Sequence, residues 1–362
     1  MRSLNFPHNP RIDEIRCLAA SLVFFFHFYL YFYKPDTQAL AGHWNWFGLF
    51  TEGHTGVGLF FTLSGFLFMQ IALHHKNIVY SDFIRNRFLR IFPLFITVFF
   101  IAISTGRDQF KAEDVLYLMF SNLGDAPTSK HFITGAAWTI SLEFTFYLVF
   151  PFLARFAIET GPRYLAQLLV LMLFIKLAAY GVSERSTHML FSTVVGRFDQ
   201  FLIGMLAAFL YRDYQAFFKR HGRIMLLAAC AVVVLNSALQ ARYGSFFSPS
   251  PKAPFWVTWS MQESLGWSFF IIAWLAADLV KPRWLDKALQ HGGDISFSFY
   301  LLHALIIYLA YDWLGPVTMT GNRQLDAVLL MLLVYAATWA FATLSYTTIE
   351  QPFLRMRHRY AR

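Results

Sequence analysis

The chain has 362 residues, of which 57% are hydrophobic, 19% are aromatic and only 14% are charged. Because soluble domains usually carry about 25% charged residues, this composition excludes an ordinary soluble globular protein. The net charge of +9 does not indicate nucleic-acid binding, since the basic residues lie at the ends of apolar runs and not on one polar module. Cys17 and Cys230 lie alone in apolar surroundings and predict neither a disulfide framework nor a metal site.

Repeated apolar runs of spanning length predict an all-α, polytopic membrane helix bundle, because each segment in lipid must satisfy its own backbone hydrogen bonds. We expect about ten transmembrane helices in a single membrane-embedded domain that covers residues 1–362. In chain order, the expected spans are 14–33, 55–74, 88–105, 137–158, 164–182, 196–211, 223–240, 258–280, 295–315 and 325–348.

Three segments need a separate interpretation. The first apolar run begins with acidic Asp13 and Glu14 and lacks a small-residue cleavage site, so we expect a retained span rather than a signal peptide. The apolar stretch 114–123 is too short to cross a membrane and is predicted to lie at the interface. The proline-containing stretch 245–255 is predicted to be a loop.

The positions of Lys and Arg predict the orientation of the spans. If the N-terminus is inside and the spans alternate, most basic residues fall in inner loops, as the positive-inside rule requires. Arg11, Arg85, Arg220 and Arg357 are examples. We therefore expect both termini in the cytoplasm and a location in the inner membrane of a bacterium.

The first span carries ionisable residues, which are costly in lipid and usually mark function. Arg16 and His27 are eleven positions apart, or three helical turns, so both project from nearly the same face, about 16 Å apart along the axis. Asp13 precedes Arg16 by one turn and is expected to pair with it. A functional interpretation makes His27 a general base. The alternative is a histidine that hydrogen-bonds a neighbouring helix and specifies packing.

Two further positions are candidates for chemistry. Arg85, Arg87 and Arg90 cluster at the entry to the third span, where planar guanidinium groups suit the phosphates of a donor such as acyl-CoA. An inner loop also collects arginines for orientation alone, and the pattern leaves both interpretations open. Glu143 lies among apolar residues of the fourth span, so it needs a partner from another helix, and it either orients the histidine or holds a helix contact.

The remaining polar residues of the spans favour packing at least as much as chemistry. They include His303, Glu263 and Lys176. Ser64 lacks a nucleophile-elbow pattern and is not predicted to be a catalytic serine. The glycines around it, in TGVGLFFTLSGF, favour close helix contact over phosphate binding, because no strand-turn-helix context surrounds them.

Seven segments in order resemble the acyltransferase-3 family of integral membrane acyltransferases. They are RIDEIRCLAASLVFFFHF, GVGLFFTLSGFLF, FIRNRFLRIFPLF, WTISLEFTFYLVFP, GRFDQFLIGMLAAF, ISFSFYLLHALII and LSYTTIEQPF. Each segment alone is a weak hydrophobic motif, whereas all seven in family order form a specific signal that covers about 11–355.

The resemblance implies a bundle of about ten helices that transfers acyl groups, often acetyl from acetyl-CoA, with no metal. It implies that His27 and Glu143 are catalytic and that Arg16, Arg85 and Arg87 bind the donor. Many relatives have paired acids in the fourth span, but here Phe144 follows Glu143, which leaves one carboxylate. Some relatives carry an additional periplasmic esterase-like domain; here transfer is expected to be completed by the membrane part or by a partner.

The expected reaction moves an acyl group onto a hydroxyl of a carbohydrate, such as a unit of lipopolysaccharide O-antigen, capsule or exopolysaccharide. His27 either deprotonates the hydroxyl or carries the acyl group itself. A transporter or flippase for acylated saccharides or lipids would also explain ionisable residues in spans. Another alternative is a lipid-modifying membrane O-acyltransferase centred on His303. The outer loop GHWNWFGLFTEGHTG is a candidate for acceptor contact.

Overall fold

The computed structural model describes residues 4–5, 7–32, 48–75, 77–105, 138–245, 250–315, 317 and 319–361. Within these ranges the chain forms helices and no strand. The helices are α1 (Pro10–Phe32), α3 (Gly48–Thr51), α4 (Thr55–His75), α5 (Tyr80–Thr105), α7 (Trp138–Thr160), α8 (Pro162–Val182), α9 (Ser186–Ser192), α10 (Val194–Asp213), α11 (Gln215–Tyr243), α12 (Phe255–Ala276), α13 (Arg283–Asp294), α14 (Ser296–Leu314), α15 (Arg323–Ser345), the π-helix η4 (Tyr346–Glu350) and α16 (Gln351–Leu354). The expected interfacial piece 114–123 lies outside the described residues.

The helices confirm an all-α, polytopic architecture. Within the described residues, eight segments are long and apolar enough to cross a membrane. The two other expected spans form α5 and α12, which are 26 and 22 residues long. The described part of the predicted loop 245–255 is non-helical up to the start of α12, also as expected.

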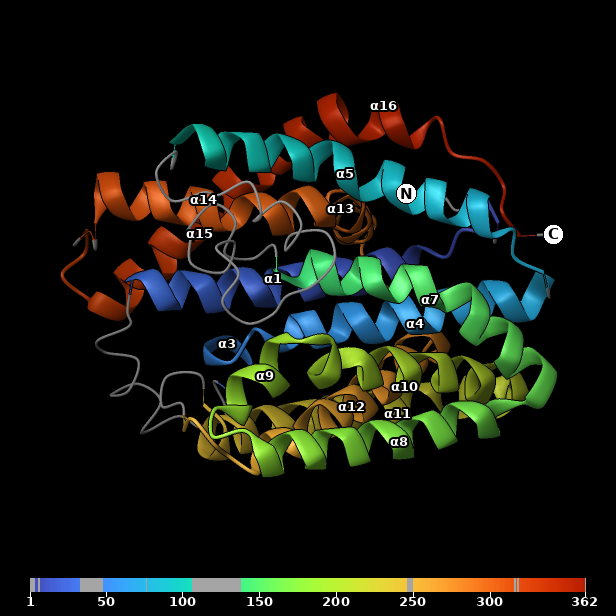
Figure 1. Ribbon diagram of the computed structural model, residues 1–362. Helices are drawn as coiled ribbons and strands as arrows, with labels where there is room; N and C mark the ends of the chain where they lie inside the picture. The colour runs from blue at the N-terminus through green and yellow to red at the C-terminus, as the bar shows by residue number, and fades with distance from the viewer. Residues whose placement is uncertain are drawn as a thin grey trace.

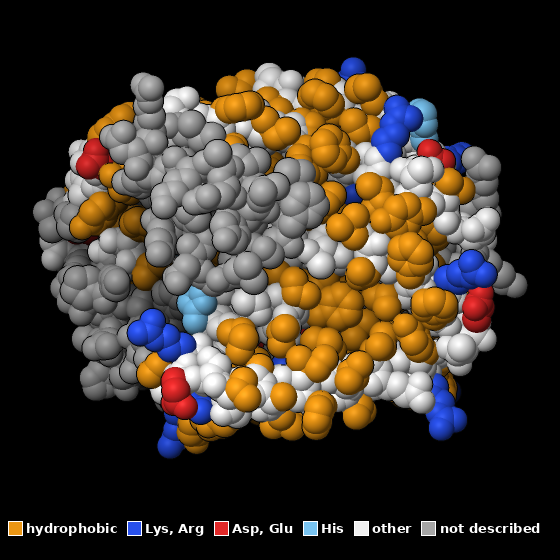
Figure 2. Space-filling view, viewed as in Figure 1, with side chains coloured by type: hydrophobic (Ala, Val, Ile, Leu, Met, Phe, Trp, Pro, Cys, Tyr) orange, Lys and Arg blue, Asp and Glu red, His pale blue; other side chains and the backbone are white. Residues whose placement is uncertain are grey.

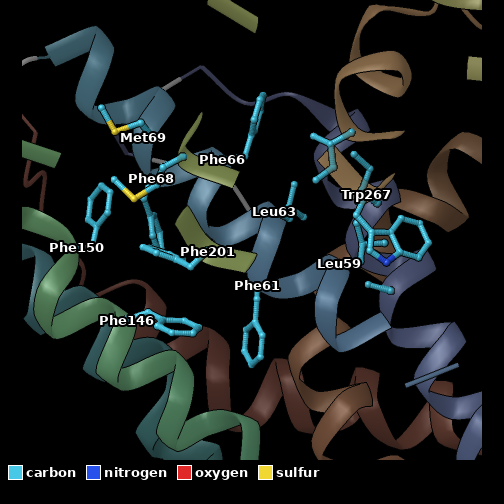
Figure 3. Packing of buried hydrophobic residues seen from close by; sticks show 14 of the residues in the cluster. Leu59, Phe61, Leu63, Phe66, Phe68, Met69, Phe146, Phe150, Phe201 and Trp267 are labelled. Atoms are coloured by element: carbon cyan, nitrogen blue, oxygen red, sulfur yellow. The ribbon is translucent and has the colours of Figure 1, made fainter. Parts of the chain in front are cut away.

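Helix α4 lies at the centre of the bundle, in contact with α1, α7, α10 and α12 (Figure 1). It is 72% buried over its most apolar window, whereas α8 is only 11% buried and lies at the periphery. Figure 3 shows the aromatic core around α4, where Phe61 and Phe68 meet Phe146 of α7 and Phe201 of α10. This core fixes the helices that surround the candidate site.

Two glycines allow α4 and α10 to pack backbone against backbone. A Cβ at Gly65 would lie 2.1 Å from the carbonyl oxygen of Phe201, and a Cβ at Gly204 would lie 2.0 Å from that of Thr62. A carbon atom cannot approach an oxygen atom this closely, so only glycine fits at these two positions. The glycines predicted to permit close helix contact therefore do so at Gly65.

Buried ion pairs connect α8, α10 and α12. Lys176 pairs with Asp199, and its Nζ also donates to the hydroxyl of Ser260 at 2.5 Å. Arg197 pairs with Glu263 at 3.2 Å. Each of these charges has an opposite charge beside it, which supports the packing interpretation of Lys176 and Glu263.

On the face shown in Figure 2, the described surface is largely apolar, and most of the charged side chains lie toward its two ends. At one end, Arg11 and Arg223 bind the same residue, Asp278, through its carboxylate and its carbonyl respectively, and Lys281 pairs with Glu14. Basic residues from separate segments that were predicted to lie inside therefore gather at one end of the bundle. Which side of the membrane this end faces stays a prediction.

Both termini lie at this end (Figure 1). The side-chain oxygen of Asn5 accepts hydrogen bonds from the backbone N–H groups of Tyr360 and Ala361, at 2.8 and 3.0 Å. Ala361 also forms an isolated antiparallel bridge with Ile78. The two ends of the chain are thus held together. Their location in the cytoplasm stays a prediction.

Candidate active site

Two adjoining cavities open at the end of the bundle that holds the termini. The entry cavity, about 260 Å³, is bounded by the N-terminal segment, α1, α4 and α5 and by Arg357 and Tyr360. The inner cavity, about 100 Å³, reaches further into the bundle, to Thr139, Glu143 and Tyr300. Both are lined by Arg16, Arg87, Arg90, Leu67 and Phe68, so these five residues form the boundary between them.

Arg87 is held in this boundary by aromatic rings. Its guanidinium carbon lies 4.9 Å from the ring centre of Phe68, 5.5 Å from that of Phe83 and 5.9 Å from that of Tyr360. Such contacts stabilise a cation without neutralising it. The Nε atom of Arg87 is buried and has no hydrogen-bond partner among the described residues, which leaves a donor for a ligand.

Arg16 reaches the same boundary from α1. Its Nη1 atom lies 2.8 Å from Asp13, which confirms the predicted pair one turn apart. The other oxygen of Asp13 lies 2.6 Å from Nε2 of His8. The carboxylate holds the arginine in place at the junction of the two cavities.

Glu143 lies in the inner cavity together with Arg16, Arg87 and Arg90. Its carboxylate accepts a hydrogen bond from the hydroxyl of Tyr147, one turn later on α7. Among the described residues, it has no hydrogen bond to His27. The arginines of α1 and α5 that line this cavity are therefore its charged neighbours.

Arg85 points away from both cavities, toward the segment 355–361. It is exposed and lines neither cavity in the described part of the chain; its Nη1 atom donates to Nδ1 of His358 at 2.9 Å. The Arg-x-Arg pair thus divides, with Arg87 in the cavities and Arg85 against the segment 355–361. A direct role of Arg85 in donor binding stays a prediction.

His27 contacts a second histidine from α14. Nδ1 of His27 lies 2.9 Å from the carbonyl oxygen of Val23 and 3.1 Å from Nε2 of His303. Nδ1 of His303 lies 2.5 Å from the carbonyl oxygen of Tyr300. His303 is only 1% exposed, whereas His27 is partly buried, and the two rings meet between α1 and α14.

These contacts assign the tautomers of both rings. A carbonyl oxygen only accepts hydrogen bonds, so in each neutral ring Nδ1 carries the proton and Nε2 carries the lone pair. The lone pair of His303 then accepts from Nδ1–H of His27, which donates to Val23 as well. Nε2 of His27 is left with a lone pair, which is the atom a general base uses.

Tyr300 connects the histidine pair to the inner cavity. Its ring lines that cavity and its hydroxyl lies 2.9 Å from that of Thr139, while its backbone carbonyl holds His303. Within the described residues, His27 lines neither cavity. The structure therefore brings Arg16, Arg87 and Glu143 together in the inner cavity. His27 lies outside that cavity and is connected to it through His303 and Tyr300.

Sequence reasoning missed one contact and two residues of this arrangement. The contact between His303 and His27 was not expected, although both residues were singled out. Tyr300 precedes His303 by nearly one turn, which is the spacing that signals a shared helix face. Arg357 was treated only as an orientation signal, because nothing in a basic segment distinguishes an arginine that lines a cavity.

Comparisons with known proteins give this arrangement its chemical context. Residues 9–346 match a family described as an acyltransferase domain. The chain belongs to the acyltransferase-3 family. The resemblance is confirmed, and the protein is a membrane acyltransferase. Family membership supports acyl transfer as the activity of this chain, and the alternative of a transporter or flippase gains no support from it.

Curated relatives of this acyltransferase-3 protein share low identity over much of its length. Nodulation protein 10 of Rhizobium leguminosarum bv. viciae is 23% identical and aligns over 97% of the chain and 94% of its own length. Acyltransferase MdmB of Streptomyces mycarofaciens is 25% identical over 97% and 92%. The O-acetyl transferase of Shigella phage Sf6 is 23% identical over 64% and 69%. No solved structure matches the chain.

Proposed function

We propose that this acyltransferase moves an acetyl or similar acyl group from acyl-CoA to a hydroxyl of a carbohydrate in the inner membrane of a bacterium. The observation that supports it most is the arginine-lined entry to the two cavities, at the predicted cytoplasmic end, followed by a histidine pair deeper in the bundle. A relative named as an O-acetyl transferase favours acetyl and a hydroxyl acceptor.

The donor enters from the side that holds the arginines. Arg16 and Arg87 bind its phosphates, because guanidinium groups match phosphate oxygens and remain charged near neutral pH. The narrower pantetheine portion of the donor occupies the inner cavity. There Glu143, held by Tyr147, accepts a hydrogen bond from an amide N–H of the pantetheine. The thioester then lies near Tyr300, next to the histidine pair.

His27 acts as the general base. Its Nε2 takes the proton from the acceptor hydroxyl while the hydroxyl oxygen bonds to the thioester carbonyl carbon. The carbon–sulfur bond then breaks, and the proton passes to the leaving sulfur, which gives an O-acyl product and free CoA thiol. As His27 becomes positively charged, its Nδ1–H donates more strongly to His303. His303 is thus a positioning residue.

Transfer or hydrolysis of labelled acetyl-CoA by the purified protein in detergent tests the proposal. The wild-type protein should release labelled acetate or acylate an added saccharide acceptor. His27→Ala should lower the rate about 10²–10⁴-fold, the usual contribution of a general base. His221→Ala is the matched control, because Nδ1 of His221 also lies near the carbonyl four residues earlier, at 3.0 Å, but the residue is on α11 and lines neither cavity in the described part of the chain.

The control should retain wild-type activity. Full activity in His27→Ala, in a protein that purifies like the wild type, would remove His27 from the chemistry. Absence of any acetyl-CoA turnover in the wild type, across saccharide acceptors, would remove the donor assignment.

A further inference from the structure

The segment 355–361, called here the arm, is fixed across the entry cavity. The side chain of Asn86 on α5 donates to the carbonyl of His358 at 2.6 Å and accepts from its N–H at 3.0 Å. The N–H of Val79 donates to the carbonyl of Tyr360 at 2.8 Å. These backbone and side-chain bonds hold the arm against α5 and the segment before it.

The arm contributes the guanidinium group of Arg357 to the lining of the entry cavity. Arg357 lines the entry cavity together with Arg16, Arg87 and Arg90, whereas the next arginine, Arg359, is exposed and lines neither cavity in the described part of the chain. The Nε atom of Arg357 donates to the carbonyl of Leu354 at 2.9 Å, which fixes the direction of the side chain.

The charges that line the entry cavity do not balance. Of the described residues in its lining, four arginines face a single acidic residue, Asp13, which already binds Arg16 and His8. Burial, together with the charges of Arg90 and Arg87, lowers the pKa of the Arg357 guanidinium to about 10. The group still carries its charge near neutral pH, so the cavity presents an excess of positive charge that a polyanion would offset.

We propose that Arg357 binds a phosphate of the acyl-CoA donor and that the arm is one wall of the donor site. The inference rests on the proposed function, because acyl-CoA supplies the phosphates. It also gives Arg85 an indirect role: its bond to His358 holds the arm in place. The phosphates thus bind between α1, α5 and the arm, which come from distant parts of the sequence.

Binding of radiolabelled acetyl-CoA to the full chain in detergent tests the inference. Arg357→Ala should raise the dissociation constant about tenfold, the usual effect of losing one charge-assisted hydrogen bond. Arg359→Ala makes the same charge change two residues away and should leave it unchanged. Displacement of the label by S-acetylpantetheine, which has no phosphate, should give the same inhibition constant in all three proteins.

Three other results of the binding experiment would contradict the inference, the proposed donor, or both. An unchanged dissociation constant in Arg357→Ala removes Arg357 from the donor site while the proposed function stands. A parallel loss of acetyl-CoA and S-acetylpantetheine binding shows that Arg357 acts through the fold, which also overturns the inference. A wild-type protein that does not bind acetyl-CoA overturns the donor assignment and the inference together.

Discussion

The reactivity of His27 depends on which ring nitrogen carries the proton, and two acceptors fix this choice. The carbonyl of Val23 lies on its own helix, whereas His303 comes from α14. Within the described residues, His303 is the acceptor that ties the ring to α14, the helix that carries Tyr300, a residue of the inner cavity. The position of the base relative to the donor therefore depends on His303.

Substitution of His303 should affect kcat and leave donor binding intact. His303→Ala removes the acceptor opposite Nδ1 of His27 and should lower kcat about 10–100-fold, in the range of lost orientation effects. His303→Gln offers an amide oxygen in a similar place and should restore part of the rate. Steady-state kinetics at varied acetyl-CoA concentration separate kcat from KM. A rise in KM alone, or no rescue by glutamine, would contradict a positioning role.

The two arginines of the Arg-x-Arg pair should differ in their effect. Arg87 lines both cavities, and its buried Nε has no partner in the described part of the chain, so Arg87→Ala should raise the KM for acetyl-CoA tenfold or more, about 1.4 kcal/mol. Arg85 contacts the arm instead, so Arg85→Ala should raise the KM by a smaller factor, about threefold. An equal or larger effect at Arg85 would show that the donor binds on the exposed side of α5.

At the scale of the helices, the bundle depends on the approach of α4 to α10. Gly204→Ala would drive a Cβ against the backbone of α4, at Thr62 and Phe66, and neither group yields as a flexible side chain would. We expect a loss of about 1–3 kcal/mol of stability, as for other overpacked contacts. Thermal unfolding in detergent measures it.

Gly181→Ala is the control for this contact. Gly181 lies in α8, and no heavy atom is within 4 Å of a Cβ built there. Its substitution should leave the unfolding temperature unchanged or raise it slightly, because alanine favours a helix over glycine. Equal unfolding temperatures for the two variants would show that α10 can move away from α4 without a measurable loss of stability.

The sequence predicted the helices well because hydrophobicity in lipid is a local property. Each expected span corresponds to a helix in the described residues, and the pair of Asp13 with Arg16 followed from helical spacing alone. Contacts between distant helices could not be derived in this way. The meeting of His27 with His303, 276 residues apart, depends on how α1 packs against α14. Periodicity contains no information about such a contact.

The divided Arg-x-Arg pair shows the same limit. Arg85 and Arg87 are two positions apart, so on a helix they point in directions that differ by about 160°. Helical geometry predicts that they separate, but it does not say which one faces the cavity. The aromatic rings around Arg87, from α4, α5, α7 and the arm, decide it.

At the scale of the whole molecule, the proposed acyl transfer depends on which end of the bundle faces the cytoplasm, because acyl-CoA is made there. The arginine-lined cavity opens at the end that holds both termini, so the proposed function requires that end to be inside. The positive-inside rule gives the same orientation, and most of the residues that it counts, such as Arg11 and Arg220, lie outside the cavity. Arg357 is counted in both arguments.

Labelling of single cysteines in intact cells tests this orientation. In a background with Cys17→Ala and Cys230→Ala, Lys219→Cys, near the connection of α10 to α11, should react with a membrane-impermeant maleimide only after the membrane is opened. Lys252→Cys, before α12 and paired with Glu184 at the opposite end, should react in intact cells. Both positions replace a lysine, so the local chemistry is matched. The reverse pattern would place the arginines outside, where no acyl-CoA reaches them, and the proposed direction of donor entry would fail.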